Sequence, residues 1–204
     1  MSIHAEQLHD SQGKVAELMS EPTFYYFAYG SCMCPVDLKR SFSEDTHSYV
    51  IGPGKVSGYR LRFSRRSLRR QCGALDIVPD PTSYVEGVLY QLPWSCPETP
   101  THRVGALGHE RLSDRLDERE EIPRNGYRRE AISVECGGQI YEDVRTYVVV
   151  QKLPQELAPN DWYFHVVMRG AVTCGLSEEY CWKLFHHMHQ LQQHQWGTQY
   201  WRSA

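Results

Sequence analysis

The residues with the clearest chemical potential are 29–33 (Tyr-Gly-Ser-Cys-Met), which follow an apolar aromatic run that begins at Phe24. Because the residues after Pro35 have helical character, Gly30 is predicted to lie in a tight turn between a strand and a helix. Such a turn can point several backbone N–H groups at one anionic or carbonyl oxygen. The sequence therefore predicts a loop that binds a carboxylate or an oxyanion.

Cys32 places a thiol in this turn. A thiol before a helix N-terminus can have a lowered pKa and act as a nucleophile, with one of the 10 histidines as its base. The alternative is that backbone amides do the binding and Cys32 is a small side chain that the turn tolerates. Cys32 and Cys34 also form a Cys-x-Cys pair, but no second pair follows at the spacing of zinc ligands, so no metal site is predicted.

Two further clusters carry charge or can titrate. Four histidines on the predicted last helix lack the additional ligands of a metal site, so they are predicted to form a solvated face. Six arginines between positions 60 and 70 could contact single-stranded nucleic acid or a substrate carboxylate, but a solvated loop is the prediction. The members of the two clusters are His186, His187, His189 and His194, and Arg60, Arg62, Arg65, Arg66, Arg69 and Arg70.

Composition limits the classes of protein that fit. The chain has 204 residues, of which 41% are hydrophobic, and a formal net charge of −3, so it can bury a core but has no general affinity for nucleic acid. Seven cysteines at irregular spacing and the absence of a basic-then-apolar leader argue against a disulfide-rich secreted domain. No apolar run approaches about 18 residues. A cytoplasmic protein with no membrane partner is predicted.

The pattern of apolar residues predicts the elements that position the turn. Strands are expected over residues 24–28, 47–56, 58–64, 73–78 and 85–92, a helix over 104–121, and a hairpin of strands 127–134 and 140–150 that turns at Gly137 and Gly138. Asn160 or Asp161 is predicted to cap one C-terminal helix, and Ser177 the next. This order indicates an α+β protein with a curved sheet or barrel, in which residues 1–22 form a polar extension, 23–195 the domain and 196–204 a tail.

Several short motifs, in this order, resemble the gamma-glutamylcyclotransferase family. The family hallmarks are a strand that ends in Tyr-Gly-Ser-Asn or Tyr-Gly-Ser-Leu and a later Leu-Asp-x-x-Glu segment. Here they correspond to residues 29–32 (Tyr-Gly-Ser-Cys) and 116–120 (Leu-Asp-Glu-Arg-Glu). The resemblance also includes residues 72–77 and 85–90, the Gly126-Tyr127 step, and Tyr163 ahead of residues 169–171. It covers roughly residues 24–190, and Cys32 departs from the family pattern.

This resemblance implies a small mixed β-barrel flanked by helices, with Glu120 as the catalytic acid/base. A gamma-glutamyl compound carries its own nucleophile, since its α-amine can close a five-membered ring on the γ-carbonyl once the chain is bent back. The α-amine has a reference pKa of about 7.7–8.0, so one carboxylate suffices to take its proton and return it to the departing amine. The products would be 5-oxoproline and a free amine or peptide.

The resemblance also implies the residues that bind substrate. Taken alone, Glu120 lies in a charged run that is typical of a solvated helix face, with Glu118 and Glu121 as alternatives if the register slips. Ser31 could bind substrate or only cap the following helix. The implied binding residues are Tyr29, Gly30, Ser31, Cys32, Met33, Tyr127 and Tyr163.

The predicted function is therefore a cofactor-free gamma-glutamylcyclotransferase that acts on a small gamma-glutamyl amino acid, peptide or amine. Two alternatives stay open. One is a ligand-binding member of the same fold that has lost turnover, and the other is a thiol enzyme that uses Cys32. The sequence does not predict an oligomeric state.

Overall fold

The computed structural model describes residues 22–42, 45–94 and 111–200. Residues 1–21 of the predicted 1–22 extension and the first part of the predicted 104–121 helix lie outside this range. The elements in chain order are β1 (Thr23–Ala28), η1 (Ser31–Met33), α2 (Pro35–Phe42), η2 (His47–Tyr49), β2 (Val50–Ser67), β3 (Cys72–Pro93), α3 (Leu112–Arg119), η3 (Ile122–Arg124), β4 (Tyr127–Cys136), β5 (Gln139–Val149), α4 (Asp161–Thr173) and α5 (Glu178–Tyr200).

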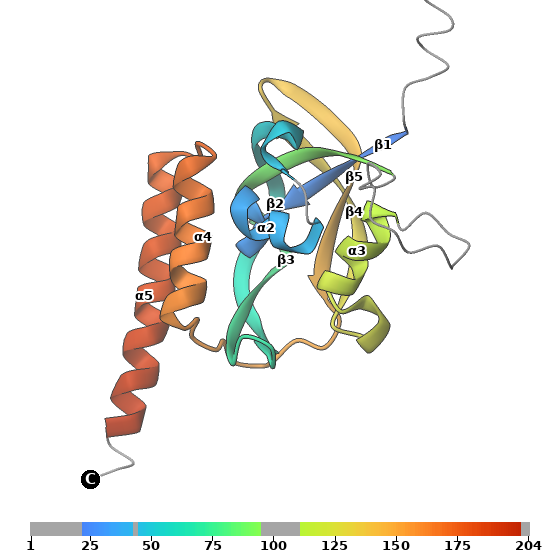
Figure 1. The fold of residues 1–204 in the computed structure, drawn as a ribbon. Helices are drawn as coiled ribbons and strands as arrows, with labels where there is room; N and C mark the ends of the chain where they lie inside the picture. Colours follow the sequence, from blue (N-terminus) through green and yellow to red (C-terminus); the bar gives the residue numbers. More distant parts are fainter. Residues whose placement is uncertain (1–21, 43–44, 95–110, 201–204) are drawn as a thin grey trace, which may run out of the picture.

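The strands close into a barrel in the order β1-β3-β2-β4-β5. Neighbouring strands pair antiparallel except at the closure, where β1 runs parallel to β5 and Tyr26 pairs with Arg145. Helices α4 and α5 lie side by side on one flank of the barrel, and α3 lies on the other (Figure 1). The predicted α+β fold, a small mixed barrel flanked by helices, is confirmed. In the described part of the chain, no helix has both the length and the apolar character of a membrane span.

The strands are longer than the sequence pattern predicts. Predicted strands 47–56 and 58–64 form one strand, β2, because Gly58, at φ 82°, accompanies a register shift between Ser57 and Tyr59 rather than a strand end. Predicted strands 73–78 and 85–92 likewise join in β3. The prediction of a strand from His47 was wrong, since buried Thr46 donates to the Pro35 carbonyl at 2.8 Å and begins the short turn η2.

Turns and caps follow the local sequence signals. Gly137 and Gly138 have φ values of 58° and 78°, as a two-residue hairpin turn requires, and they join β4 to β5. The Asn160 side chain accepts a hydrogen bond from the Tyr163 N–H at 2.9 Å and caps α4. Ser177 caps α5 through the Tyr180 N–H at 3.2 Å, and α5 continues to Tyr200, beyond the predicted start of the tail.

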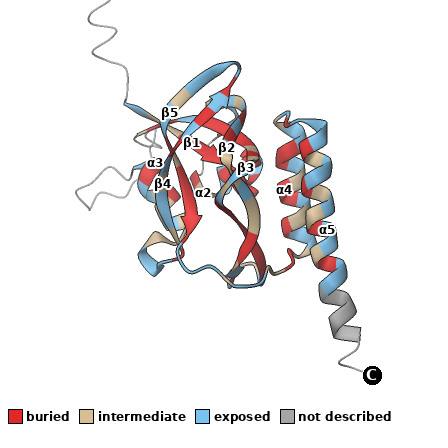
Figure 2. Ribbon diagram, turned by 180° about the vertical axis from the view of Figure 1, so that it is seen from behind, coloured by how far each residue is buried: buried red, intermediate tan, exposed pale blue. Residues whose placement is uncertain are grey.

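Buried side chains fill the barrel and line the faces of α4 and α5 that meet it (Figure 2). The turn after β1 is held by this core. The hydroxyl of fully buried Tyr90 lies 3.0 Å from the Cys32 carbonyl and 3.1 Å from the Met33 carbonyl, to which it donates. Gly170 allows α4 to approach the same turn, because a Cβ there would lie 2.6 Å from the Cys34 nitrogen. The core therefore fixes the backbone of η1.

Gly87→Ala is expected to destabilise the barrel without touching the site. A Cβ at Gly87 would lie 2.3 Å from the Ala28 carbonyl oxygen and 2.7 Å from the Phe27 ring, so β1 and β3 would have to separate. Such overpacking costs about 1–3 kcal/mol, which urea unfolding would measure. Ser57→Ala, on an exposed position of β2, is the control. An unchanged midpoint for Gly87→Ala would contradict the close strand contact.

Candidate active site

A cavity of about 60 Å³ lies where the η1 turn, the β2–β3 hairpin and the end of α3 meet. It brings together residues that are distant in the sequence. Of the eight predicted site residues, the structure places seven in the cavity lining, which are Tyr29, Gly30, Ser31, Cys32, Glu120, Tyr127 and Tyr163.

Met33 is the exception. Its side chain is fully buried, and it is not part of the cavity lining. Its backbone N–H donates to the Gly30 carbonyl at 3.0 Å, which closes the short 3₁₀ turn. This turn directs Met33 toward α4, where the position of a Cβ on Gly170 would be 2.8 Å from the Met33 Cβ. Met33 is thus a packing residue of the turn and cannot contact a ligand in the cavity.

The η1 turn presents backbone donors, as its sequence predicts. Among the described residues, nothing accepts a hydrogen bond from the N–H groups of Ser31 and Cys32. Ser31 does not cap a helix with its side chain, which instead accepts a hydrogen bond from Arg119 at 3.4 Å. Gly30 faces Tyr163, whose hydroxyl would lie 3.2 Å from a Cβ at this position.

Glu120 enters the cavity because α3 ends just before it. The Glu120 N–H still donates to the Leu116 carbonyl, whereas Glu121 takes a left-handed conformation, with φ 54°, and reverses the chain. The Tyr127 N–H then donates to the Glu120 carbonyl at 3.2 Å, so β4 begins beside the carboxylate. Glu118 is exposed on α3, and Glu121 is paired with Arg65. Of these three carboxylates, Glu120 alone lines the cavity without being committed to an ion pair in the described structure.

The surroundings of Glu120 raise its pKa. The Cys32 thiol lies 3.4 Å from Glu120 Oε1 and donates to it. Burial raises the pKa of the Glu120 carboxyl above its usual value, while Arg119, the Cys32 thiol, Arg70 and Arg65 oppose this shift. A carboxylate with a raised pKa is a stronger base than an exposed one, as proton transfer near neutral pH requires.

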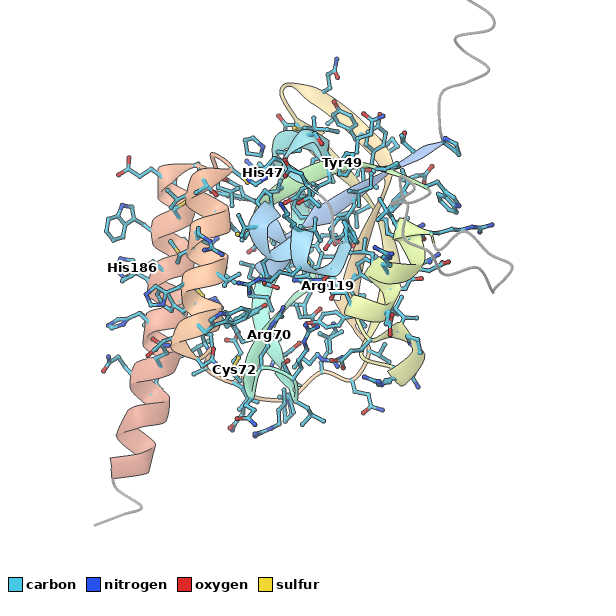
Figure 3. The ribbon with its side chains drawn as sticks, viewed as in Figure 1. His47, Tyr49, Arg70, Cys72, Arg119 and His186 are labelled. Atoms are coloured by element: carbon cyan, nitrogen blue, oxygen red, sulfur yellow. The ribbon has the colours of Figure 1, made fainter. Side chains whose placement is uncertain are left out.

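Arg119 is the main site residue that the sequence reasoning missed. Its side chain is only 5% exposed and forms an ion pair with Asp37 at 2.5 Å. Its Nε donates to Cys32 Sγ at 3.0 Å, and another nitrogen donates to the Ser41 hydroxyl. Arg119 thereby joins α3 to α2 and to the η1 turn, and Figure 3 shows it between these helices. Its position immediately before Glu120 is the signal that could have found it.

The tyrosines of the cavity are neutral and hydrogen-bonded. Tyr127 donates to the Leu75 carbonyl at 2.9 Å, and the Tyr163 hydroxyl accepts from the Leu75 N–H at 3.2 Å. Tyr29 donates to the Tyr147 carbonyl. Burial raises the pKa of Tyr163 to about 12, so its hydroxyl stays protonated at neutral pH. These contacts make the tyrosines walls of fixed shape.

Tyr26 and Tyr147 also line the cavity, and the sequence reasoning did not select them. Tyr26 lies on β1, three residues before Tyr29, in the aromatic run that leads into the turn. Tyr147 donates to Asp117 Oδ1 at 2.7 Å, and Asp117 belongs to the same Leu-Asp-x-x-Glu segment as Glu120. This contact fixes α3 against β5.

The environment of Cys32 does not favour a thiolate. Burial raises the pKa of Cys32 to about 11, although Arg119 lowers it in part. No histidine is among the residues that line the described cavity. The thiol-enzyme alternative was predicted to use a histidine as its base, and the described cavity lining holds none.

The histidines of α5 lie away from this cavity. His186 stacks on Trp182 and His189 on Phe185, whereas His187 faces the barrel and lies 3.1 Å from Glu156. The prediction of a solvated face therefore does not hold for His187, which the packing of α5 turns inward. Over residues 22–42, 45–94 and 111–200, no group of three or more histidine, cysteine or acidic side chains is placed to hold a metal ion.

The fold and the cavity define a gamma-glutamylcyclotransferase-like barrel domain, and comparisons with known proteins agree. Residues 109–184 match the AIG2-like family. YkqA of Bacillus subtilis, named as a candidate gamma-glutamylcyclotransferase, is 33% identical over 172 residues, or 84% of this chain and 54% of YkqA. The crystal structure of YkqA superposes with a TM-score of 0.68 at 32% identity, over 83% of this chain and 55% of that one.

Two more distant structures share the fold alone. A solved gamma-glutamyl cyclotransferase is 20% identical, with a TM-score of 0.63, over 80% of this chain and 86% of that one. An uncharacterized protein from Homo sapiens is 22% identical, with a TM-score of 0.65, over 80% of this chain and 87% of that one. Together these matches confirm the resemblance to the gamma-glutamylcyclotransferase family that the sequence motifs predict. The chain spans about half the length of YkqA.

Proposed function

We propose that this chain is a gamma-glutamylcyclotransferase that releases 5-oxoproline from a gamma-glutamyl amino acid, peptide or amine. The observation that carries the proposal is the position of Glu120. Its carboxyl group has a raised pKa and lines the same cavity as Ser31 and Cys32, whose N–H groups donate to no described residue. A base and an anion-binding turn that share one small cavity suit a reaction in which the substrate supplies its own nucleophile.

The proposed reaction has two steps. Glu120 removes a proton from the substrate α-ammonium group, and the free amine nitrogen attacks the γ-carbonyl carbon. The carbonyl oxygen becomes negatively charged, and the N–H groups of Ser31 and Cys32 stabilise it. When the amide bond to the leaving group breaks, Glu120 gives this proton to the departing nitrogen. The regenerated carboxylate then takes the second proton from the ring nitrogen, which leaves the neutral lactam, and passes it to the released amine, which departs as an ammonium group. Atoms and charge balance without a cofactor or an enzyme nucleophile.

The walls of the cavity would select the bent conformer of the substrate. Five-membered ring closure requires the α-amine and the γ-carbonyl to approach each other, and this lowers the entropy of the bound substrate. Tyr127 and Tyr163 are both anchored to Leu75, and Tyr29 is anchored to β5, so none of the three needs to reorganise when substrate binds. A rigid cavity holds the two reacting atoms together at a lower entropic cost.

The direct test is to incubate the purified chain with gamma-glutamyl dipeptides, gamma-glutamylamines and glutathione and to measure 5-oxoproline. Release from at least one compound, in proportion to enzyme, is the expected result. If every compound binds but none releases 5-oxoproline, the chain is a ligand-binding member of the fold and the proposed reaction is wrong.

Cys32→Ser is expected to keep 5-oxoproline release within about tenfold of the wild type. A serine hydroxyl can also donate to Glu120 and accept from Arg119, and the proposed reaction needs no thiolate. The wild-type thiol, with its pKa raised to about 11, should also react slowly with iodoacetamide at neutral pH. Complete loss of release in Cys32→Ser, in a folded protein, would instead favour the thiol enzyme.

A further inference from the structure

A second hollow adjoins the catalytic cavity and carries an excess of positive charge. It is an open cleft of about 370 Å³, lined by α2, the β2–β3 turn, the end of α3 and the start of α4. Arg69, Arg70 and Arg119 line both the cleft and the cavity. A substrate that leaves the cavity on this side must therefore pass the arginines.

The arginines of the cleft outnumber the carboxylates. Arg40, Arg69, Arg70 and Arg119 line it, whereas Asp37 is the sole carboxylate in its described lining. Asp37 is already shared, because Arg119, Arg40 and Arg70 lie 2.5, 3.6 and 3.8 Å from its oxygens. Four positive charges therefore face one negative charge, so the described lining of the cleft has a net positive charge.

Two of these guanidinium groups, those of Arg69 and Arg70, are placed to contact a ligand in the cleft. Arg70 lies over the rings of Trp162 and Tyr163, at 5.6 and 5.0 Å from their centroids, and these contacts hold it in place. Arg69 is exposed on the hairpin turn and has no hydrogen bond or ion pair with any described residue. In Figure 3, Arg70 lies below Arg119, in the region between α4 and α3. A carboxylate could pair with both without displacing an existing ion pair of Arg69.

We propose that this cleft binds the leaving group and selects gamma-glutamyl peptides in which the residue after the γ-linkage is acidic. The proposal rests on the proposed function, since it assigns the cavity to the gamma-glutamyl unit. That unit carries one α-carboxylate and one α-ammonium group, so its net charge is zero. An acidic leaving residue adds two carboxylates, its α-carboxylate and its side chain, which offset the charge excess of the cleft better than a neutral residue or a simple amine.

The test compares γ-glutamyl-glutamate with γ-glutamyl-glutamine, which has nearly the same shape but one carboxylate fewer. Binding is measured by calorimetry on Glu120→Gln, and 5-oxoproline release is measured on the protein with Glu120 intact. Each is repeated with Arg69→Glu and with Arg66→Glu, an exposed residue of the same hairpin that lines neither hollow. We expect γ-glutamyl-glutamate to bind at least about tenfold more tightly, the lower end for hydrogen bonds to charged groups. Arg69→Glu should remove this preference, and Arg66→Glu should keep it.

The outcomes separate the two proposals. Equal binding of the two peptides, or a preference that survives Arg69→Glu, overturns the cleft proposal even if 5-oxoproline is released. A preference that Arg69→Glu removes, without release from any peptide, supports the cleft and overturns the proposed reaction. If neither peptide binds or reacts, the cleft proposal is wrong, and the proposed reaction is then decided by the gamma-glutamylamines and glutathione.

Discussion

We expect Glu120→Gln to lower 5-oxoproline release by at least about a hundredfold, the lower end of the usual contribution of a general acid or base. Glutamine keeps the shape of the side chain and can still accept the hydrogen bond from the Cys32 thiol, but it cannot take a proton from the substrate amine. The loss should appear in kcat, because proton transfer belongs to the chemical step. A coupled assay for 5-oxoproline, at saturating substrate, measures it.

Glu118→Gln is the matched control, since Glu118 is an exposed residue of the same helix. It should release 5-oxoproline at the wild-type rate. Equal release by Glu120→Gln and Glu118→Gln would remove Glu120 from the mechanism. Glu121, the other carboxylate in the described cavity lining, would then be the candidate, although it is paired with Arg65.

Because the pKa of Glu120 is raised, we expect Glu120→Gln to lose activity without losing stability. Because burial raises the pKa, the folded protein binds the proton more tightly than the unfolded chain does. The resulting stabilisation is complete below the unfolded pKa and is lost as the pH rises through the folded pKa. Once the carboxyl group is ionised this stabilisation is absent, so Glu120→Gln should unfold at the same temperature as the wild type or at a higher one. A lower midpoint at pH 7 would contradict the direction of this shift.

Local signals in the sequence predicted the centre of the site. Gly30 and Pro35 mark the turn after β1, and a strand followed by a tight turn and a helix needs no long-range information. The hairpin glycines and the helix caps were predicted correctly for the same reason. The sequence did not predict the side-chain directions within the turn. The 3₁₀ geometry that turns Met33 into the core depends on the hydrogen bond from Tyr90 and on the approach of α4.

Long-range contacts explain what the sequence could not predict. Arg119 acts through Asp37 and Cys32, which are 82 and 87 positions away, and no spacing rule connects them. The merged strands β2 and β3 follow from their pairing with each other, since the antiparallel ladder continues on both sides of the register shift at Gly58. Long-range contacts also give the arginines between positions 60 and 70 different surroundings. The hairpin places Arg69 and Arg70 beside α2 and α4, whereas Arg66 lies outside both hollows.

We expect Asp37→Asn to lower the free energy of unfolding by about 3 kcal/mol, the lower end of the cost of breaking a buried ion pair. Asp37 and Arg119 have side-chain exposures of 4% and 5%, so removing one charge leaves the other without its partner in a poorly solvated place. We take the lower end of this cost because Cys32 and Glu120 also lie near Arg119 and favour its charged form when Asp37 is removed. For a domain of this size, the unfolding midpoint should fall by about 6–12 °C.

The control for this variant is Asp143→Asn, an exposed residue of β5 with a left-handed backbone that asparagine tolerates. It should unfold like the wild type. An unchanged midpoint in Asp37→Asn would mean that solvent compensates Arg119, and the ion pair would then have no structural role.

The double variant Asp37→Asn with Arg119→Met separates stability from organisation of the site. Removing both charges eliminates the uncompensated cation, so the double variant should be more stable than Asp37→Asn alone. Its 5-oxoproline release should nevertheless stay below that of the wild type, because the Cys32 thiol loses the Arg119 hydrogen bond that fixes it beside Glu120. Recovery of stability without recovery of rate would identify Arg119 as a positioning residue, since a residue needed only for folding would recover both. The buried ion pair would then serve the fold and the site through the same guanidinium group, with Asp37 on one side of it and the Cys32–Glu120 contact on the other.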